Sequence, residues 1–476
     1  MLFVVALVAP LAAAAVVGWR RTAGWVTVVA AGIVLVVGIV AAGQTVDGSA
    51  LVLSDWLRID ALTAVMLIVI GAVGLVATWA GLGHEASGDV AAARRYGVLV
   101  PLFLAAMVLA VLANNLGLLW AAVEATTIVT AFLVGHRRTR AALEATWKYV
   151  VICSVGIALA YLGTVLVHYA ARQAGISEHG TLDWTQLVAH AGDLDPGVMR
   201  LAFALLVLGF GTKAGMVPLH SWLPDAHSQA PAPVSALMSG VLLPVAVYAL
   251  LRYRVIAIRS VDPTFVRGLL LALALTSLLL AASLLLAQRD YKRMLAYSSI
   301  EHMALVVIGV AAGTPLAIAA ALLHILGHGL TKAVLFCGAG EILSRTGSTR
   351  IADVRGLLSR APILAGVFAV GLAALLGLPP FSLLVSEIGL IRAGLDTGLG
   401  WAMAVVLVLL LVAFVAIAGK TSRMLFGTNP APPAAALSVR SVVPVVAGLC
   451  LVAVLGIADW PLGELLRSAS LIAGSR

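Results

Sequence analysis

The sequence predicts an all-α polytopic membrane protein with about 14 transmembrane helices, and three observations support this. Of the 476 residues, 62% are hydrophobic and 11% are charged, whereas soluble domains carry about 25% charged residues. The mean hydropathy is +1.10. Apolar runs recur along the whole chain at lengths that can cross about 30 Å of hydrocarbon. The chain is therefore expected to lie within a lipid membrane.

The predicted spans follow one another with short polar connections. They are 2–18, 25–43, 61–82, 97–113, 115–135, 148–170, 199–218, 232–251, 268–287, 295–312, 315–342, 362–392, 400–419 and 442–458. The first run precedes Arg20 and Arg21, whereas a secretory signal places its positive charges ahead of the apolar stretch, so no cleavage is expected. The protein is therefore expected in the cell (plasma) membrane with both termini outside.

This orientation places 18 of the 30 Lys and Arg residues in cytoplasmic connections, as the positive-inside rule requires. Four arginines fall on the outer side against that trend: Arg252, Arg254, Arg259 and Arg267. The net charge of +9 is thus mainly a topology signal, and no nucleic-acid partner is indicated.

No cofactor or metal site is predicted in this chain. Cys153, Cys337 and Cys450 are scattered in apolar segments without a CxxC pair, which is typical of small core residues. His324 and His328 are too close in sequence to ligate opposite faces of one haem. Sequence patterns for an iron–sulfur cluster, a nucleotide fold and a phosphate loop are all lacking, so redox catalysis by this chain alone is not expected.

Two connections are long. Residues 171–197 read as a solvated outer loop with a short helix near the string TLDWTQLV, and residues 428–437 read as an extended Pro-rich spacer.

Two of the predicted spans contain residues that break helices. Glycines at 209, 211 and 215 lead to Pro218 and Pro224 in the seventh span, and Gly377, Pro379 and Pro380 divide the twelfth. Breaks at matching places in two halves predict an inverted repeat of five helices. We expect helices 1–3 in residues 1–96, the repeats in 97–254 (helices 4–8) and 255–427 (helices 9–13), and a linker with helix 14 in 428–476.

Ionisable residues inside the spans mark the candidate site. A cation at the depth of Lys213 costs about 2.5–3.5 kcal/mol to insert, so such residues are functional candidates. Glu124 lies mid-span in the same five-helix set, and contact between the two is expected because each would favour the charged form of the other. A static ion pair joining the helices is the alternative.

His324, His328 and Lys332 recur every four residues and therefore share one helix face. A stripe of groups that titrate at different pH values is suited to carrying protons. Zinc binding is the rival, but lysine is a poor ligand and no third His, Cys or carboxylate stands beside them in sequence. Histidines that only pack between helices are the other alternative.

Other titratable residues each have two alternative roles. Glu387 follows the second break and is either a structural acid or the last carrier of the series. Glu301 and His302 are equally suited to an interfacial or a relay role. His220 and His227 lie in a Pro-rich turn, which either only reverses the chain or carries protons towards the cytoplasm.

Five strings together resemble the proton-translocating antiporter-like subunits found in respiratory complex I, Mrp sodium/proton antiporters and group 4 membrane-bound hydrogenases. They are FGTKAGMVPLHSWLPDAH, APAPVSALMSG, YKRMLAYSSIEHM, LLHILGHGLTKAVLF and LPPFSLLVSE, in the family's order. AYSSIEHM and PPFSLLVSE look most like the F component of hydrogenase-4, as in formate hydrogenlyase-type complexes.

The resemblance implies roles for these residues. Glu124 and Lys213 match the glutamate and lysine of the input half, Glu387 matches the charged residue of helix 12, and His324, His328 and Lys332 match the central connection. Lys292 matches a further lysine, although its neighbours Arg289 and Arg293 suggest a cytoplasmic helix end. Relatives often carry His or Lys where Ser239 or Pro244 stands, so protons must cross there through water or another residue.

The leading hypothesis is a proton-translocating membrane subunit of a hydrogenase-like or complex I-like oxidoreductase complex. Its partners would be other antiporter-like subunits and a peripheral redox arm, which would hold iron–sulfur clusters and a NiFe or other redox centre. The alternatives are an Mrp-type cation/proton antiporter subunit and a scaffold subunit that does not pump.

Overall fold

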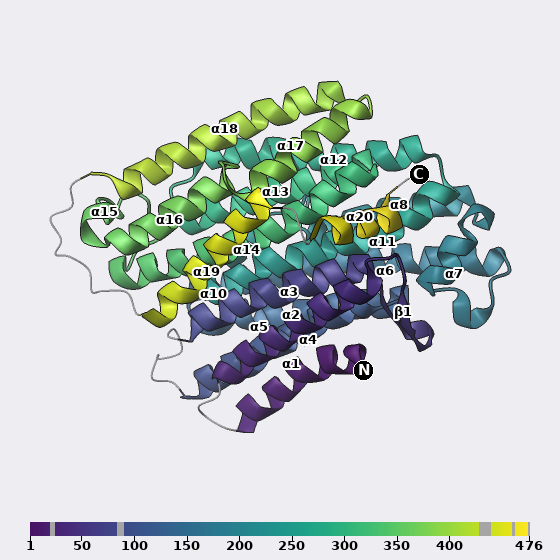
Figure 1. The fold of residues 1–476 in the computed structure, drawn as a ribbon, viewed down its shortest axis with the longest axis horizontal. Coiled ribbons are helices and arrows are strands. Elements are labelled where there is room, and N and C mark those ends of the chain that lie inside the picture. Colours follow the sequence, from purple (N-terminus) through teal and green to yellow (C-terminus); the bar gives the residue numbers. More distant parts are fainter. Residues whose placement is uncertain (20–23, 83–89, 428–438, 459–461, 475–476) are drawn as a thin grey trace.

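The computed structural model describes residues 1–19, 24–82, 90–427, 439–458 and 462–474, and within these ranges it is almost entirely helical (Figure 1). The predicted cytoplasmic arginines Arg20 and Arg21 and the predicted spacer 428–437 lie outside the described residues.

The N-terminal part holds three long helices and one hairpin. Its elements are α1 (Leu2–Trp19), α2 (Gly24–Thr45), β1 (Leu51–Leu53), β2 (Leu57–Ile59) and α3 (Ala61–Gly81). The two strands pair antiparallel, with Leu51 opposite Ile59. The all-α prediction did not include this hairpin, which leads directly into Asp60 and the start of α3.

The next part covers the residues of the first predicted repeat. Its elements are α4 (Val90–Leu112), α5 (Leu116–Val134), α6 (Arg140–Gln173), α7 (Trp184–Ala189), α8 (Pro196–Lys213), α9 (Trp222–Gln229), α10 (Ala232–Leu237), a π-helical segment (Met238–Leu242) and α11 (Leu243–Ser260). The short helix expected in the loop 171–197 is confirmed as α7. Because α11 continues past residue 251, Arg252 and Arg254 are buried within a helix instead of lying in a connection.

The remaining elements cover the residues of the second predicted repeat and the C-terminal part. They are α12 (Pro263–Ala287), α13 (Tyr291–Ala312), α14 (Pro315–Thr346), α15 (Leu357–Arg360), α16 (Pro362–Leu375), α17 (Ser382–Asp396), α18 (Gly400–Leu425), α19 (Val439–Ile457) and α20 (Leu462–Ala473).

In the described part of the chain, 12 helices are long and apolar enough to cross a membrane, or 13 if the bent pair α19 and α20 forms one span. The twelfth predicted span is interrupted: α16 is a shorter apolar helix, and α17 follows it after a break. This span and the last predicted one, which is counted only as part of the bent pair, are why the count by length falls below the predicted 14. The multi-pass, all-helical class that composition predicted is confirmed.

Helix α14 forms the centre of the bundle. It contacts α3, α10, α13, α16, α17, α19 and α20, while α1 and α18 lie at opposite edges (Figure 1). Almost every residue from Ala317 to Ile342 is buried. Polar side chains on α14 are therefore held away from lipid, which suits a path for ions through the bundle.

Candidate functional site

Lys213 is the last residue of α8 and is buried, with 1% of its surface exposed. Its Nζ donates hydrogen bonds to the Thr127 hydroxyl and to the Tyr149 hydroxyl, each at 2.8 Å. Thr127 in turn donates to Glu124 Oε2 at 2.9 Å. The expected direct contact between Glu124 and Lys213 is therefore wrong in its geometry, because a threonine hydroxyl one turn along α5 bridges them.

The break after Lys213 explains why a cation stands there. Gly215 has φ +78° and ends the helix, and a Cβ at that position would lie 2.3 Å from Leu223. Trp222, at the start of α9, donates its Nε1 hydrogen to the Thr212 carbonyl at 2.9 Å and packs edge-on against Tyr149. The break thus places Lys213 in the last turn of α8, where the helix dipole has its negative end.

The predicted stripe on α14 is present and fully buried. The rings of His324 and His328 stack with centroids 6.5 Å apart, as one helical turn requires. Lys332 donates to the Leu295 carbonyl at 2.8 Å and to the Ser298 hydroxyl. The three residues therefore form a continuous polar line inside an apolar bundle.

His302 also contacts this line of polar residues. The sequence alone left its role open. His302 lies midway along α13, and its Nδ1 is 2.9 Å from His324 Nε2. Its ring centroid is 4.9 Å from that of His328. The other nitrogen of His324 is 2.9 Å from the Ser386 hydroxyl of α17. The positions of α13 and α17 bring these groups together, and neither follows from local sequence spacing.

Glu387 on α17 lies at the same cluster. His302, His324 and Glu387 each offer a ligand atom, and these atoms lie within 4.8 Å of one another. The sequence argument against a metal relied on the lack of a third His or carboxylate, and the fold supplies both. The two histidine nitrogens nevertheless face one another at hydrogen-bond distance, an arrangement that passes a proton from ring to ring.

At Ser239, where the sequence provides no titratable residue to pass protons, two hydroxyl groups lie together. Ser239 lies in the π-helical segment, where its Oγ is 2.8 Å from Ser299 Oγ and 3.5 Å from His328 Nε2. The backbones of this segment and α14 touch, since a Cβ on Gly240 would lie 2.9 Å from the Gly329 carbonyl. Pro244 is buried in the first turn of α11. A pair of serines thus stands where relatives often carry a titratable residue.

Further titratable residues lie on or beside α9 and α13. His227 on α9 is buried and stacks on Phe336, and neither of its ring nitrogens has a hydrogen-bond partner among the described residues. Lys292 begins α13 as expected, but it is buried and donates to the Ser228 and Ala230 carbonyls at 3.1 and 2.9 Å. Glu301 is also buried. His220 is only half-buried in the turn before α9.

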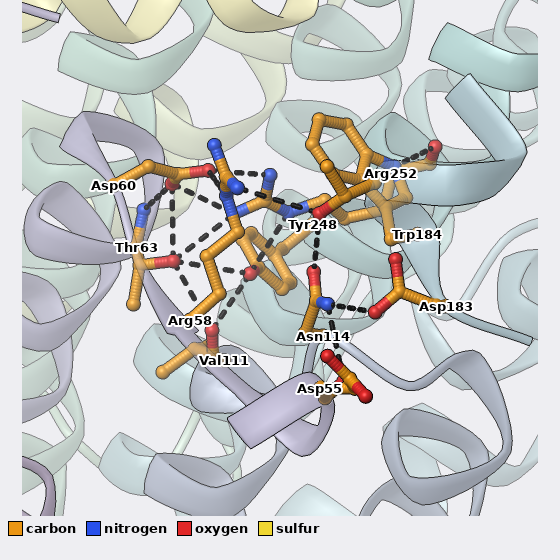
Figure 2. A network of polar contacts seen from close by, with 11 residues as sticks. Asp55, Arg58, Asp60, Thr63, Val111, Asn114, Asp183, Trp184, Tyr248 and Arg252 are labelled. Atoms are coloured by element: carbon orange, nitrogen blue, oxygen red, sulfur yellow. Dashed lines mark hydrogen bonds and ion pairs between the residues drawn. The ribbon is translucent and has the colours of Figure 1, made fainter. Parts of the chain in front are cut away.

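A separate ion-pair network closes the end of the bundle at the β-hairpin (Figure 2). Asp60 accepts two hydrogen bonds from the Arg252 guanidinium, each at 2.8 Å, and also caps α3 through the Thr63 amide. Arg252 further contacts the Tyr248 hydroxyl and covers the Trp184 ring. We call these five residues the outer clamp, after the side of the membrane on which the predicted topology places them.

Charge in the outer clamp is balanced locally. Burial alone would raise the pKa of the Asp60 carboxyl, but the charge and hydrogen bonds of Arg252 hold that pKa well below its usual range. Tyr248 donates to the Val111 carbonyl at 2.7 Å, so α4 is tied to the same point. Next to it, Asn114 contacts Asp183, whose pKa is raised by burial. Sequence periodicity gave no sign of this network, because its members come from four separate segments, residues 60–63, 111–114, 183–184 and 248–252.

Comparison with known proteins identifies the family to which the chain is similar. Residues 113–413 match the family described as NADH:quinone oxidoreductase/Mrp antiporter, TM. The chain is 41% identical over 294 residues to a hydrogenase-4 component F homolog from Methylacidiphilum infernorum, covering 62% of each chain. It is 32% identical over 343 residues to hydrogenase-4 component B of Escherichia coli, covering 70% of this chain. The matches span 62% and 50% of the lengths of these two relatives.

The fold is also similar to that of solved structures. A chain of the archaeal membrane-bound sulfane sulfur reductase, a respiratory membrane complex, superposes with a TM-score of 0.89 at 24% identity. The superposition covers 99% of this chain and 97% of the other. The arrangement of helices is therefore shared along the whole length.

Proposed function

This chain belongs to the NADH:quinone oxidoreductase/Mrp antiporter family of transmembrane proteins, and we propose that it is the proton-translocating subunit of a hydrogenase-like or complex I-like oxidoreductase complex. One observation carries the proposal. Buried titratable groups form two sets inside the bundle. Hydrogen bonds link Glu124, Thr127 and Lys213 in the first set, and His302, His324 and Glu387 lie together in the second. Such groups are costly within a membrane and are typical of ion pathways.

In the proposed mechanism, Lys213 takes up a proton from the cytoplasm and the central residues Lys332, His328 and His324 receive it. Glu387 then releases it outwards. Glu124 acts on Lys213 through Thr127, so rotation of a single hydroxyl opens or closes the connection between them. Moving one charge outwards costs about 2.3 kcal/mol per 100 mV, so redox chemistry in partner subunits must drive the cycle.

The proposed organisation follows the repeats. Residues 97–254 would form the input half and residues 255–427 the output half, flanked by 1–96 and 428–476. Both termini would face outwards from the cell membrane. The iron–sulfur clusters and the NiFe or other redox centre would reside in partner subunits, next to further antiporter-like subunits.

The test uses the assembled complex reconstituted in vesicles containing a pH-sensitive dye. Glu124→Gln and Lys213→Ala should abolish proton translocation while the complex still assembles, and Glu178→Gln, an exposed glutamate of the 171–197 loop, should leave it unchanged. Full translocation in both site variants would overturn the proposal and favour a scaffold. Sodium uptake driven by a proton gradient without a redox substrate, lost in Lys213→Ala, would instead favour an Mrp-type antiporter.

A further inference from the structure

A charged cavity lies at the helix ends opposite the outer clamp. Its volume is about 930 Å³, and it is lined by the start of α6, by α9, by the connection between α12 and α13, by residues 349–355 and by the end of α18. We call it the basic basin, because seven Lys or Arg and three Asp or Glu side chains line it. By the predicted topology it faces the cytoplasm.

Most of the positive charge in the basic basin is not neutralised by the protein. Asp225 pairs with both Lys148 and Arg293, and Glu144 pairs with Lys148 as well. Asp290, the third acid, caps α13 through the Arg293 amide and accepts from Thr349. All three acids are thus engaged within the fold.

Five basic residues remain around the basic basin. Lys420 donates to the Leu286 carbonyl at 2.9 Å, and four arginines make no ion pair with any residue that the structure describes: Arg289, Arg350, Arg355 and Arg423. All four are exposed. A planar guanidinium recognises phosphate oxygens in a two-point contact, and several converging on one cavity select an anion with more than one charge.

The wall beside the basic basin is apolar and exposed. Leu286 lines the basin with 56% of its surface exposed, and Leu279, seven residues earlier on the same face of α12, is 55% exposed. On the neighbouring helix α18, Leu411 and Val415 are 64% and 60% exposed. An anion-binding cavity that continues into an apolar surface along two membrane helices has the two parts of a lipid site.

We propose that the basic basin binds the phosphate headgroup of an anionic lipid, whose acyl chains lie along α12 and α18. A soluble phosphate would use the arginines but not the apolar wall. An acidic protein segment would use the charge but would not need exposed leucines that continue away from the cavity. The site is independent of the proton path, because none of the proposed carriers lines it.

The experiment is native mass spectrometry of the purified chain with phosphatidylglycerol, cardiolipin or phosphatidylcholine added. Anionic lipid should be retained over phosphatidylcholine. Removing two of the unpaired arginines in Arg289→Gln/Arg423→Gln should weaken that binding roughly tenfold or more. The matched control is Arg94→Gln/Arg95→Gln, which removes the same charge from two exposed arginines at the start of α4 and should leave binding unchanged.

Three outcomes would overturn the proposal. One is equal retention of phosphatidylcholine, and another is an equal loss of binding in the two double variants. The third is displacement of the lipid by millimolar-range inorganic phosphate, which would identify the basin as a site for soluble phosphate. Because all four substituted arginines are exposed, folding is checked by the thermal unfolding midpoint, which should be the same in both double variants.

Discussion

Lys213 and Glu124 are connected by the hydroxyl of Thr127, which accepts a hydrogen bond from the lysine and donates one to the carboxylate. A direct ion pair fixes its charges in place, whereas a hydroxyl has one hydrogen and can rotate. The distance between the two charged groups is therefore spanned by a group that can connect or disconnect them without helix movement.

Thr127→Val tests this connection, because valine keeps the shape and removes the hydroxyl. Proton translocation should fall about tenfold, since a buried donor left without its partner costs about 1–3 kcal/mol. Thr126→Val is the control: Thr126 is also buried on α5, and its hydroxyl bonds only the Val123 carbonyl of its own helix. Equal effects of the two substitutions would argue for loss of packing.

Ser239 allows a second test of the path. Ser239→Ala breaks the contacts with Ser299 and His328 and should slow translocation several-fold, whereas Ser239→His, which introduces a titratable ring, should retain most of it. Ser260→Ala on α11 serves as control, because that hydroxyl bonds only carbonyls of its own helix. Unchanged rates in Ser239→Ala, measured in vesicles, would exclude a role for this serine.

His302→Ala should lower translocation on the order of a hundredfold, the usual cost of removing a positioned proton carrier. The variant removes the ring that faces His324 at 2.9 Å. His168→Ala, near the C-terminal end of α6 where the ring contacts Thr181, should pump normally. A normal rate in His302→Ala would place the path through other groups.

The proposal of a proton relay also predicts the metal content. If His302 and His324 are hydrogen-bonded to one another, elemental analysis of the purified protein should find no stoichiometric zinc. One zinc per chain that disappears in His302→Ala would instead make His302, His324 and Glu387 a metal site.

The outer clamp has a predictable pH dependence. Because the pKa of Asp60 is depressed in the folded chain, its contribution to stability is complete above the unfolded value of about 3.9 and is lost as the pH falls below it. Asp60→Asn should lower the free energy of unfolding by about 3–5 kcal/mol at neutral pH, by leaving Arg252 buried and unpaired. Asp60→Asn should also remove the loss of stability that low pH causes through this carboxyl group.

Thermal unfolding in detergent at several pH values measures the effect on the clamp. Arg58→Gln provides the comparison: it removes the more exposed of the two partners of Asp60 and leaves the Arg252 pair in place, so a smaller loss of stability is expected. A similar loss of stability in the two variants would show that the Asp60–Arg252 pair contributes no more to the free energy of unfolding than the Asp60–Arg58 pair.

The sequence predicts the class of fold well, because a membrane imposes long apolar runs that are visible one segment at a time. It also locates both helix breaks, since Gly215 and Gly377 with their prolines act locally. The resemblance to the F component of hydrogenase-4 is confirmed by the relatives found. The β-hairpin was missed because three-residue strands carry almost no periodic signal.

The site is predictable where its members share one helix. His324, His328 and Lys332 follow from four-residue spacing alone. His302 and Ser386 do not, because their proximity to His324 depends on how α13 and α17 pack against α14. Thr127 was missed for a different reason: threonine is common in helices, and only a structure shows which hydroxyl lies between two charges.

The π-helical segment Met238–Leu242 has a consequence for how this chain tolerates change. A π turn holds one residue more than an α turn, so this segment takes up one residue without changing the rotational phase of α11 after it. Deleting one residue from the regular part of α11 between Leu243 and Arg252 would turn Arg252 by about 100° and carry it away from Asp60. Such a deletion should therefore be far more harmful than a deletion inside the π-helical segment, which can shorten to an α turn and leave Arg252 facing Asp60.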